Sequence, residues 1–392
     1  MVKKGLLATS IAHSYNDMYF YLFPLLMPLF RMEFALNYTQ VGIVMTVFMA
    51  IIALFTSIWG SLGDKYDHHR VLSLGFVIAT VGLLAVTLPT RFAWVVLFVA
   101  LTGIGVSTFH PLATAMISFS ISRPGFSMGV FEGSGTLGGI FATVVMSLLI
   151  SSWGWRWTVV LLALPGLLLA FIFYRKVTIA RVPNHAQTVQ RPTALRVLML
   201  FFTGRTLRGL AAGAVISFLP SYILEAWQLN PSTGSIIYAT FFVGGLIGAV
   251  YLGHLADRIS HILLVTITTL MPVLLIITVT LPVSLPFGVL ILLLIGACFT
   301  GFYPPHNRWI AEGITQEQRG KYFGIGMTLE TLAFAVAPGI FGFLADRAGL
   351  VTALRSTTSI WLIAGVFFTL VLIKSGHSRH LRDDPGGAHG CN

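Results

Sequence analysis

Long apolar stretches separated by short polar gaps make up most of the chain. They lie at residues 7–30, 38–60, 71–89, 92–118, 125–150 and 157–174 and, after a longer polar gap, at 197–222, 233–253, 262–281, 286–308, 320–344 and 351–373. Each stretch is close to the roughly 20 residues that an α-helix needs to cross the hydrocarbon core of a bilayer. The pattern therefore predicts an all-α integral membrane protein with twelve transmembrane helices.

The composition narrows the class of protein further. Of the 392 residues, 56% are hydrophobic and 9% are charged, whereas soluble domains are about 25% charged. This composition excludes most soluble enzymes, and its high hydrophobicity excludes a disordered chain. The 2 cysteines are too few for a disulfide framework or a cysteine metal site.

The basic residues predict an orientation in the membrane. The 24 Lys and Arg outnumber the 13 Asp and Glu, but no basic run is interleaved with aromatic residues, so we expect no nucleic-acid partner. With the N-terminus in the cytoplasm, seventeen basic residues fall on that side and five on the other. This bias predicts a multi-pass protein of the cell (inner or plasma) membrane with both termini cytoplasmic. The five are Arg31, Arg91, Arg156, Arg347 and Arg355.

The chain contains one internal repeat. Residues 60–65 read Gly-Ser-Leu-Gly-Asp-Lys, and 193 residues later 253–258 read Gly-His-Leu-Ala-Asp-Arg. We therefore expect two pseudo-symmetric six-helix bundles, 1–174 and 197–374, joined by a cytoplasmic linker at 175–196 and followed by a tail at 375–392. Such halves enclose a substrate site near the middle of the membrane and rock around it.

The repeated loops are candidates for a gate. Their glycines allow neighbouring helices to approach closely, and their charges can form a conformational latch with a helix end. The alternative is that the charges are ordinary solvated loop residues. The candidate gate residues are Gly60, Gly63, Asp64, Lys65, Arg70, Gly253, Asp257 and Arg258.

At these residues the chain resembles a known family. The run Gly60–Tyr66 resembles the signature between the second and third helices of the major facilitator superfamily of secondary transporters. The chain departs from that signature at Asp67, His68 and His69, where the family usually has Gly, Arg, and Arg or Lys. The resemblance implies the major facilitator fold and alternating access for a small-molecule substrate. We expect a functional monomer in the lipid bilayer without a cofactor.

A narrower resemblance involves the stretches 7–30 and 92–118. The motifs at residues 13–17 (His-x-x-Asn-Asp) and 109–111 (Phe-His-Pro) resemble the fosmidomycin-resistance branch, which is associated with drug efflux. The chain departs from this branch at Leu112, where an acidic residue is common, and at Glu132, where Gln is frequent. The stretch 125–150 also lacks the Gly-Pro that ends the efflux-associated signature.

Ionisable residues inside membrane helices are costly and indicate function or a buried partner. The acids Asp17, Glu132 and Glu330 are candidates for proton coupling, because burial and neighbouring cations can tune a carboxyl group for proton exchange. Their alternative role is a structural pair or a hydrogen bond between helices.

Two arginines one turn apart suggest an anion site. Arg205 and Arg208 keep their charge, and their guanidinium groups suit a carboxylate, phosphate or phosphonate. The alternative is that Asp17, Glu132 or Glu330 neutralises them. The predicted substrate-binding residues are Arg205, Arg208, His110, His13, Asn16 and Tyr19.

The chain contains no phosphate-binding loop, no His/Glu zinc helix motif and no nucleophile elbow. We therefore expect neither an enzyme nor a metal site, and transport driven by an ion gradient or by the gradient of the substrate. The leading hypothesis is proton-coupled efflux, by an antiporter, of a small anionic or amphiphilic solute. Import of an organic anion or siderophore-like solute is the alternative, and a non-transporting receptor or membrane enzyme is a remote one.

Overall fold

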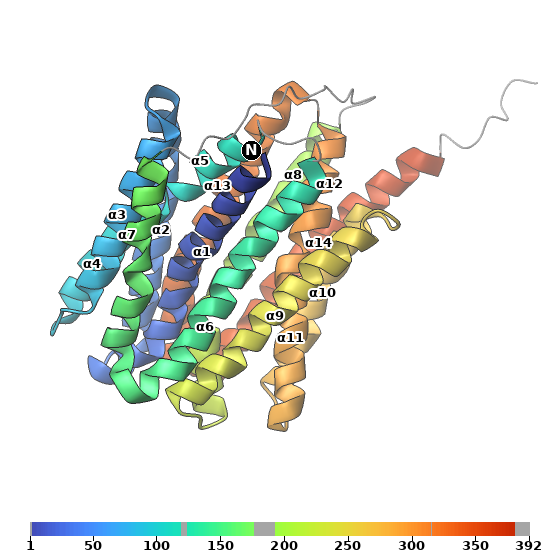
Figure 1. Ribbon diagram of the computed structural model, residues 1–392. Coiled ribbons are helices and arrows are strands. Elements are labelled where there is room, and N and C mark those ends of the chain that lie inside the picture. The colour runs from blue at the N-terminus through green and yellow to red at the C-terminus, as the bar shows by residue number, and fades with distance from the viewer. Residues whose placement is uncertain (1, 119–123, 176–192, 315, 381–392) are drawn as a thin grey trace, which may run out of the picture.

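The computed structural model describes residues 2–118, 124–175, 193–314 and 316–380, and it leaves the side chains of Asp64 and Glu132 undescribed. The described chain forms fourteen α-helices and no strand, and the helices lie side by side (Figure 1). In chain order they are α1 Val2–Glu33, α2 Tyr38–Lys65, α3 His68–Val86, α4 Phe92–Val106, α5 Phe109–Ser118, α6 Pro124–Ala163, α7 Pro165–Tyr174, α8 Leu195–Ala226, α9 Pro231–Leu255, α10 His261–Val279, α11 Leu285–Gly301, α12 Tyr303–Gly313, α13 Gln316–Ala348 and α14 Leu350–His380.

These helices make twelve passes across the bundle. Ten segments of the described residues are long and apolar enough to span a membrane, and one of them, Gly133–Tyr174, has 42 residues. That segment reverses at Gly154, whose φ of +70° is a conformation that favours glycine, so it contributes two passes. With α1 added, the total is twelve, as the hydropathy pattern predicts.

The passes form two bundles of six. We call α1–α7 the N-half and α8–α14 the C-half. The halves meet where α2 packs on α13, α6 on α9 and α1 on α8. Glycines permit the close approach of α2 and α13, because a Cβ at Gly42 would collide with the carbonyl of Pro338, and one at Gly342 with that of Tyr38. We call the end where α1 begins and α14 finishes the termini end (Figure 1).

The fourth and tenth passes are broken in corresponding places. The fourth pass is interrupted between α4 and α5, just before Pro111, and the tenth between α11 and α12, just before Pro304. Proline lacks the amide hydrogen that would continue a helix. The repeated glycines lie against these prolines: a Cβ at Gly60 would contact Pro111, and one at Gly253 would contact Pro304. The internal repeat thus places the same packing contact in both halves.

Polar contacts join the halves at the end opposite the termini. Asp346 of α13 accepts hydrogen bonds from the backbone N–H groups of Tyr38 and Thr39, both at 2.8 Å, at the start of α2. Glu225 of α8 pairs with Arg31 of α1 at 2.8 Å and accepts a hydrogen bond from the Tyr38 hydroxyl. These contacts hold the halves together at the opposite end.

Replacing Asp346 with Ala should weaken this closure. Removing the side chain that accepts hydrogen bonds from the N–H groups at a helix start lowers the free energy of unfolding by about 1 kcal/mol. The melting temperature of the purified protein should therefore fall. Asp346→Asn keeps one acceptor oxygen, so its melting temperature should fall less than that of Asp346→Ala. Equal melting temperatures for Asp346→Ala and the parent would show that the cap does not stabilise the closed end.

Candidate functional site

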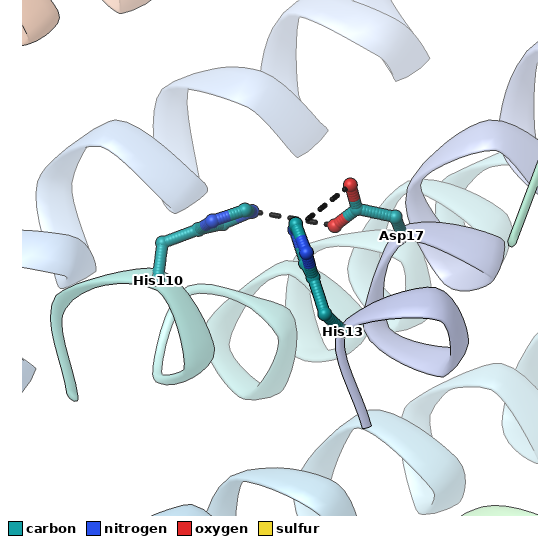
Figure 2. Close-up of side chains that lie close together, drawn as sticks. All are labelled: His13, Asp17 and His110. Atoms are coloured by element: carbon teal, nitrogen blue, oxygen red, sulfur yellow. Dashed lines mark ion pairs between the residues drawn. The ribbon is translucent and has the colours of Figure 1, made fainter. Parts of the chain in front are cut away.

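Two histidines and a carboxylate meet inside the N-half. His13 and Asp17 lie one turn apart on α1, and His110 approaches from the first turn of α5 (Figure 2). Asp17 lies 3.3 Å from Nε2 of His13 through Oδ2, and 3.3 Å from Nε2 of His110 through Oδ1. The exposed fractions of the side chains are 2% for His13, 15% for Asp17 and 37% for His110. This cluster is thus anchored in the bundle and accessible on the His110 side.

Packing against α6 fixes the position of this cluster. The Ser134 hydroxyl lies 3.2 Å from Nδ1 of His13, and the ring of Phe109 stacks on His13 at 5.5 Å. Gly135 makes room for the carboxylate, because a Cβ there would collide with Oδ2 of Asp17. The three groups offer three ligand atoms within 4.8 Å of one another. Two imidazoles and one carboxylate can hold a proton, a polar substrate group or a divalent metal ion.

The C-half contains a second buried cluster, which is built around one carboxylate and two guanidinium groups. Arg205 donates from Nε to Glu330 at 2.7 Å, and Arg208 donates from Nη1 to the same carboxylate at 3.3 Å. The hydroxyl of Tyr303 also donates to Glu330, at 3.2 Å. All three charged side chains are at least nine-tenths buried. Of the three carboxylates that the sequence left open as partners of the arginines, the structure brings Glu330 to them.

The surroundings of Arg208 differ from those of Arg205. Arg208 is fully buried, donates to the carbonyl of Phe299 at 2.6 Å and lies 3.8 Å above the ring of Phe302. Cation–π contact of this kind stabilises a desolvated guanidinium group. Arg205 keeps a small exposed fraction of 6%. Both arginines thus hold Glu330, Arg205 through the shorter bond, and Arg205 is the slightly more accessible of the two.

The C-half cluster has spare hydrogen-bond donors. Among the described residues, Nη1 of Arg205 and Nε of Arg208 are buried without a hydrogen-bond partner. One carboxylate also leaves the two guanidinium groups with one uncompensated positive charge. Buried donors without partners are costly, so an anion that reaches Arg205 would gain both charge pairing and hydrogen bonds.

The two clusters are related by the internal repeat. Residues 109–111 read Phe-His-Pro, and 193 residues later 302–304 read Phe-Tyr-Pro. His110 contacts Asp17 in the N-half, as Tyr303 contacts Glu330 in the C-half. Each helix break thus presents a polar side chain to a carboxylate in its own half. The sequence analysis missed this match, although the same 193-residue offset would have found it.

The two remaining predicted binding residues, Asn16 and Tyr19, are buried. Asn16 is 2% exposed, and its amide donates to Oδ1 of Asp17 at 3.4 Å. Tyr19 is fully buried, and its hydroxyl contacts that of Thr80 at 2.9 Å and donates to the carbonyl of Ala163 at 3.1 Å. The structure therefore places Tyr19 in the packing of the N-half and not with the histidine cluster.

The predicted gate residues lie at the termini end. Asp257 pairs with Arg308 of α12, which also pairs with Glu312 at 3.0 Å, so this ion pair stays within the C-half. Lys65, Arg70 and Arg258 are exposed, and the side chain of Asp64 lies outside the described part. The proton-coupling roles of Asp17 and Glu132 and the gating roles of these loops stay predictions. The contacts between halves at Glu225 and Asp346 were missed, because charges at helix ends resemble ordinary solvated residues in a sequence.

Comparison with known proteins gives the family. The family model described as Major Facilitator Superfamily matches residues 9–208 and 201–388, which include both halves. The chain is 24% identical over 270 residues to the Fosmidomycin resistance protein of Escherichia coli, covering 65% of each chain. It is 25% identical over 321 residues to the Proton-coupled antiporter flippase LtaA of Staphylococcus aureus, covering 79% of this chain and 80% of the relative. It is 26% identical over 260 residues to the Probable sulfoacetate transporter SauU of Cupriavidus necator, covering 59% of each.

Solved structures support the fold. A bacterial homolog of the human lysosomal transporter Spinster, in an inward-facing and occupied conformation, superposes with a TM-score of 0.80 at 16% identity. The superposition covers 94% of this chain and 96% of that one. From the family match in both halves and the shared fold, we conclude that this chain belongs to the Major Facilitator Superfamily and is a multi-pass membrane transporter, not an enzyme.

Proposed function

We propose that this chain is a proton-coupled secondary transporter of a small organic anion, which binds at Arg205 in the C-half. The observation that supports the proposal most is the buried cluster in which one carboxylate, Glu330, serves two arginines. Its excess positive charge and its donors without partners favour an anionic ligand. We assign Arg208, which is fully buried, to holding the cluster, and Arg205 to the substrate.

Coupling follows from competition for Arg205. An anion that binds Arg205 takes a partner from Glu330, and protonation of Glu330 frees Arg205 for the anion. Binding of the anion and binding of the proton therefore favour each other, and this effect is reciprocal by thermodynamic linkage. In this mechanism Glu330 binds the coupled proton, and the proton and the anion cross the membrane in the same direction.

The names of two relatives agree with an anionic substrate. One name refers to fosmidomycin and the other to sulfoacetate. Fosmidomycin is a small molecule with a phosphonate group, and sulfoacetate is one with a sulfonate group. A guanidinium group binds such oxyanions through paired hydrogen bonds. We assign the termini end to the cytoplasm from the distribution of basic residues, so the closure at the opposite end corresponds to an inward-facing state in the cell membrane.

Efflux by proton antiport is the second candidate. It is favoured by residues 13–17 and 109–111, which resemble the fosmidomycin-resistance branch, and by the similarity to the proton-coupled antiporter of Staphylococcus aureus. In that mechanism the proton and the substrate compete instead of binding together. The two candidates therefore differ in the direction in which a pH gradient drives the substrate.

Proteoliposomes that contain the purified protein separate these candidates. Labelled fosmidomycin and labelled sulfoacetate serve as probes, with the membrane potential clamped at zero. Cotransport accumulates the anion in an alkaline lumen, whereas antiport accumulates it in an acidic lumen. Arg205→Gln should abolish accumulation, and Arg196→Gln on the same helix is the matched control, because Arg196 is exposed. If Arg205→Gln transports both anions as well as the parent does, the binding assignment is wrong.

A further inference from the structure

We infer that His13, Asp17 and His110 form a binding site for one divalent transition-metal ion, for which Zn²⁺ is the best match. The sequence analysis expected no metal site, because the three residues match no metal-binding motif: His110 is 93 positions from Asp17 in the chain. The break between α4 and α5 brings it to α1. The inference does not depend on the proposed anion transport, which rests on residues of the C-half.

The distances are compatible with a bound metal ion. Both N···O distances in the cluster are 3.3 Å, which is longer than the roughly 2.9 Å typical of a hydrogen bond. Around a tetrahedral Zn²⁺ with bonds of about 2.1 Å, ligand atoms are separated by about 3.4 Å. Oδ2 of Asp17 has this separation from His13, and Oδ1 has it from His110. One ligand atom from each residue lies within 4.8 Å of the other two, so side-chain rotations would bring the three groups to one ion.

The ligand chemistry points to the same class of ion. Imidazole nitrogen and carboxylate oxygen are ligands of Zn²⁺ and of the neighbouring divalent metals, whereas Ca²⁺ and Mg²⁺ prefer oxygen alone. Asp17 also supplies a negative charge that compensates half of the charge of the ion. Three protein ligands leave a coordination position for water or another small ligand.

His13 is oriented as a metal ligand needs to be. Its Nδ1 lies 3.2 Å from the hydroxyl of Ser134, which can accept the Nδ1 hydrogen and leave the Nε2 lone pair directed at the site. Such a second partner fixes the tautomer and the ring orientation of metal-binding histidines. The stacked ring of Phe109 further restricts the imidazole. His13 is therefore pre-organised, whereas His110, which is 37% exposed, gives the ion access.

A bound ion would connect α1 to α5 across the break of the fourth pass. Both helices belong to the N-half, so the ion would stiffen this half without joining it to the C-half. We therefore expect binding to raise the melting temperature. This readout requires no knowledge of the substrate, and it stays informative even if the proposed function is wrong.

Binding of Co²⁺ and Zn²⁺ to the full-length protein in nanodiscs tests the inference. The affinity tag is removed first, because its histidines bind metals. Co²⁺ should produce the visible ligand-field bands of a low-coordinate nitrogen and oxygen site, and calorimetry should show one Zn²⁺ per chain that displaces Co²⁺. His110→Gln and Asp17→Asn should each weaken binding at least about tenfold, as loss of supporting groups does at metal sites.

Two further variants distinguish the loss of a metal ligand from misfolding of the protein. His254→Gln, at an exposed histidine near the end of α9, should bind both ions as the parent does. His110→Cys replaces one metal ligand by another and should restore binding, with a new sulfur-to-Co²⁺ charge-transfer band. The inference is overturned if the parent shows no Co²⁺ bands, if Asp17→Asn and His110→Gln bind as tightly as the parent, or if His110→Cys lacks the sulfur band.

Discussion

Glu330→Gln should abolish accumulation of the anion in response to a pH gradient, while downhill exchange of the same anion continues. The amide keeps the size of the side chain and one acceptor for the arginines, but it cannot exchange a proton. We expect gradient-driven accumulation to fall by at least about tenfold, the factor that corresponds to ~1.4 kcal/mol. Uptake of labelled fosmidomycin or sulfoacetate with and without a pH gradient measures the effect.

This variant also tests the stability of the buried cluster. Breaking a buried ion pair by removing one charge costs about 3–5 kcal/mol, so the melting temperature of Glu330→Gln should fall. Glu330→Asp keeps the proton-exchanging group and should retain accumulation. Glu312→Gln is the matched control, since Glu312 is a half-exposed partner of Arg308 and should leave both properties unchanged. Full accumulation in Glu330→Gln would remove Glu330 from the coupling mechanism.

Gly42→Leu should shift the protein away from the state closed at the end opposite the termini. A side chain at Gly42 would collide with the Pro338 carbonyl, which belongs to the backbone of α13 and cannot rotate away. Overpacking of this kind costs about 1–3 kcal/mol, enough to change the ratio of two conformations by about five- to 150-fold. The collision arises only while α2 and α13 are in contact, so the open state should gain population.

Spin labels measure this shift. Met32 lies in the last turn of α1 at the opposite end, Leu281 lies just after α10 at the same end, and both are exposed. The distance between labels at these positions should become longer in Gly42→Leu. Gly324→Leu on α13 is the matched control, because no atom lies within 4 Å of the position of its Cβ. An unchanged distance distribution in Gly42→Leu would show that the contact between α2 and α13 does not hold the closed state.

Hydropathy predicts the passes well and their ends poorly. The first stretch, 7–30, becomes α1 at Val2–Glu33, and 197–222 becomes α8 at Leu195–Ala226. Backbone hydrogen bonds continue a helix past the point where charged residues begin, since such residues are stable in the polar interface. The prolines at 111, 304 and 305 mark the two broken passes, because proline acts locally and is visible in the sequence.

The sequence predicts which candidate site residues share a helix face, but not which residues of different helices are in contact. The spacing of His13 and Asp17, and of Arg205 and Arg208, places each pair on one helix face. Contact between residues on different helices depends on packing, so His110 could not be joined to Asp17, and Glu330 could not be chosen over Asp17 and Glu132 as the partner of the two arginines. For the same reason the partners of the Tyr19 hydroxyl inside the N-half could not be read from the sequence, and its role in substrate binding stays a prediction.

The distribution of ion pairs also bears on the speed of the conformational cycle. Each of the two clusters lies within a single half, so rocking of the halves separates neither Asp17 from the two histidines nor Glu330 from the two arginines. The pair between Arg31 and Glu225 does join the halves, but its side chains are 35% and 41% exposed. Exposed pairs of this kind contribute about 0–1 kcal/mol. The two states can therefore interconvert without breaking the ion pairs of either cluster, and each half carries its own cluster with it as it moves.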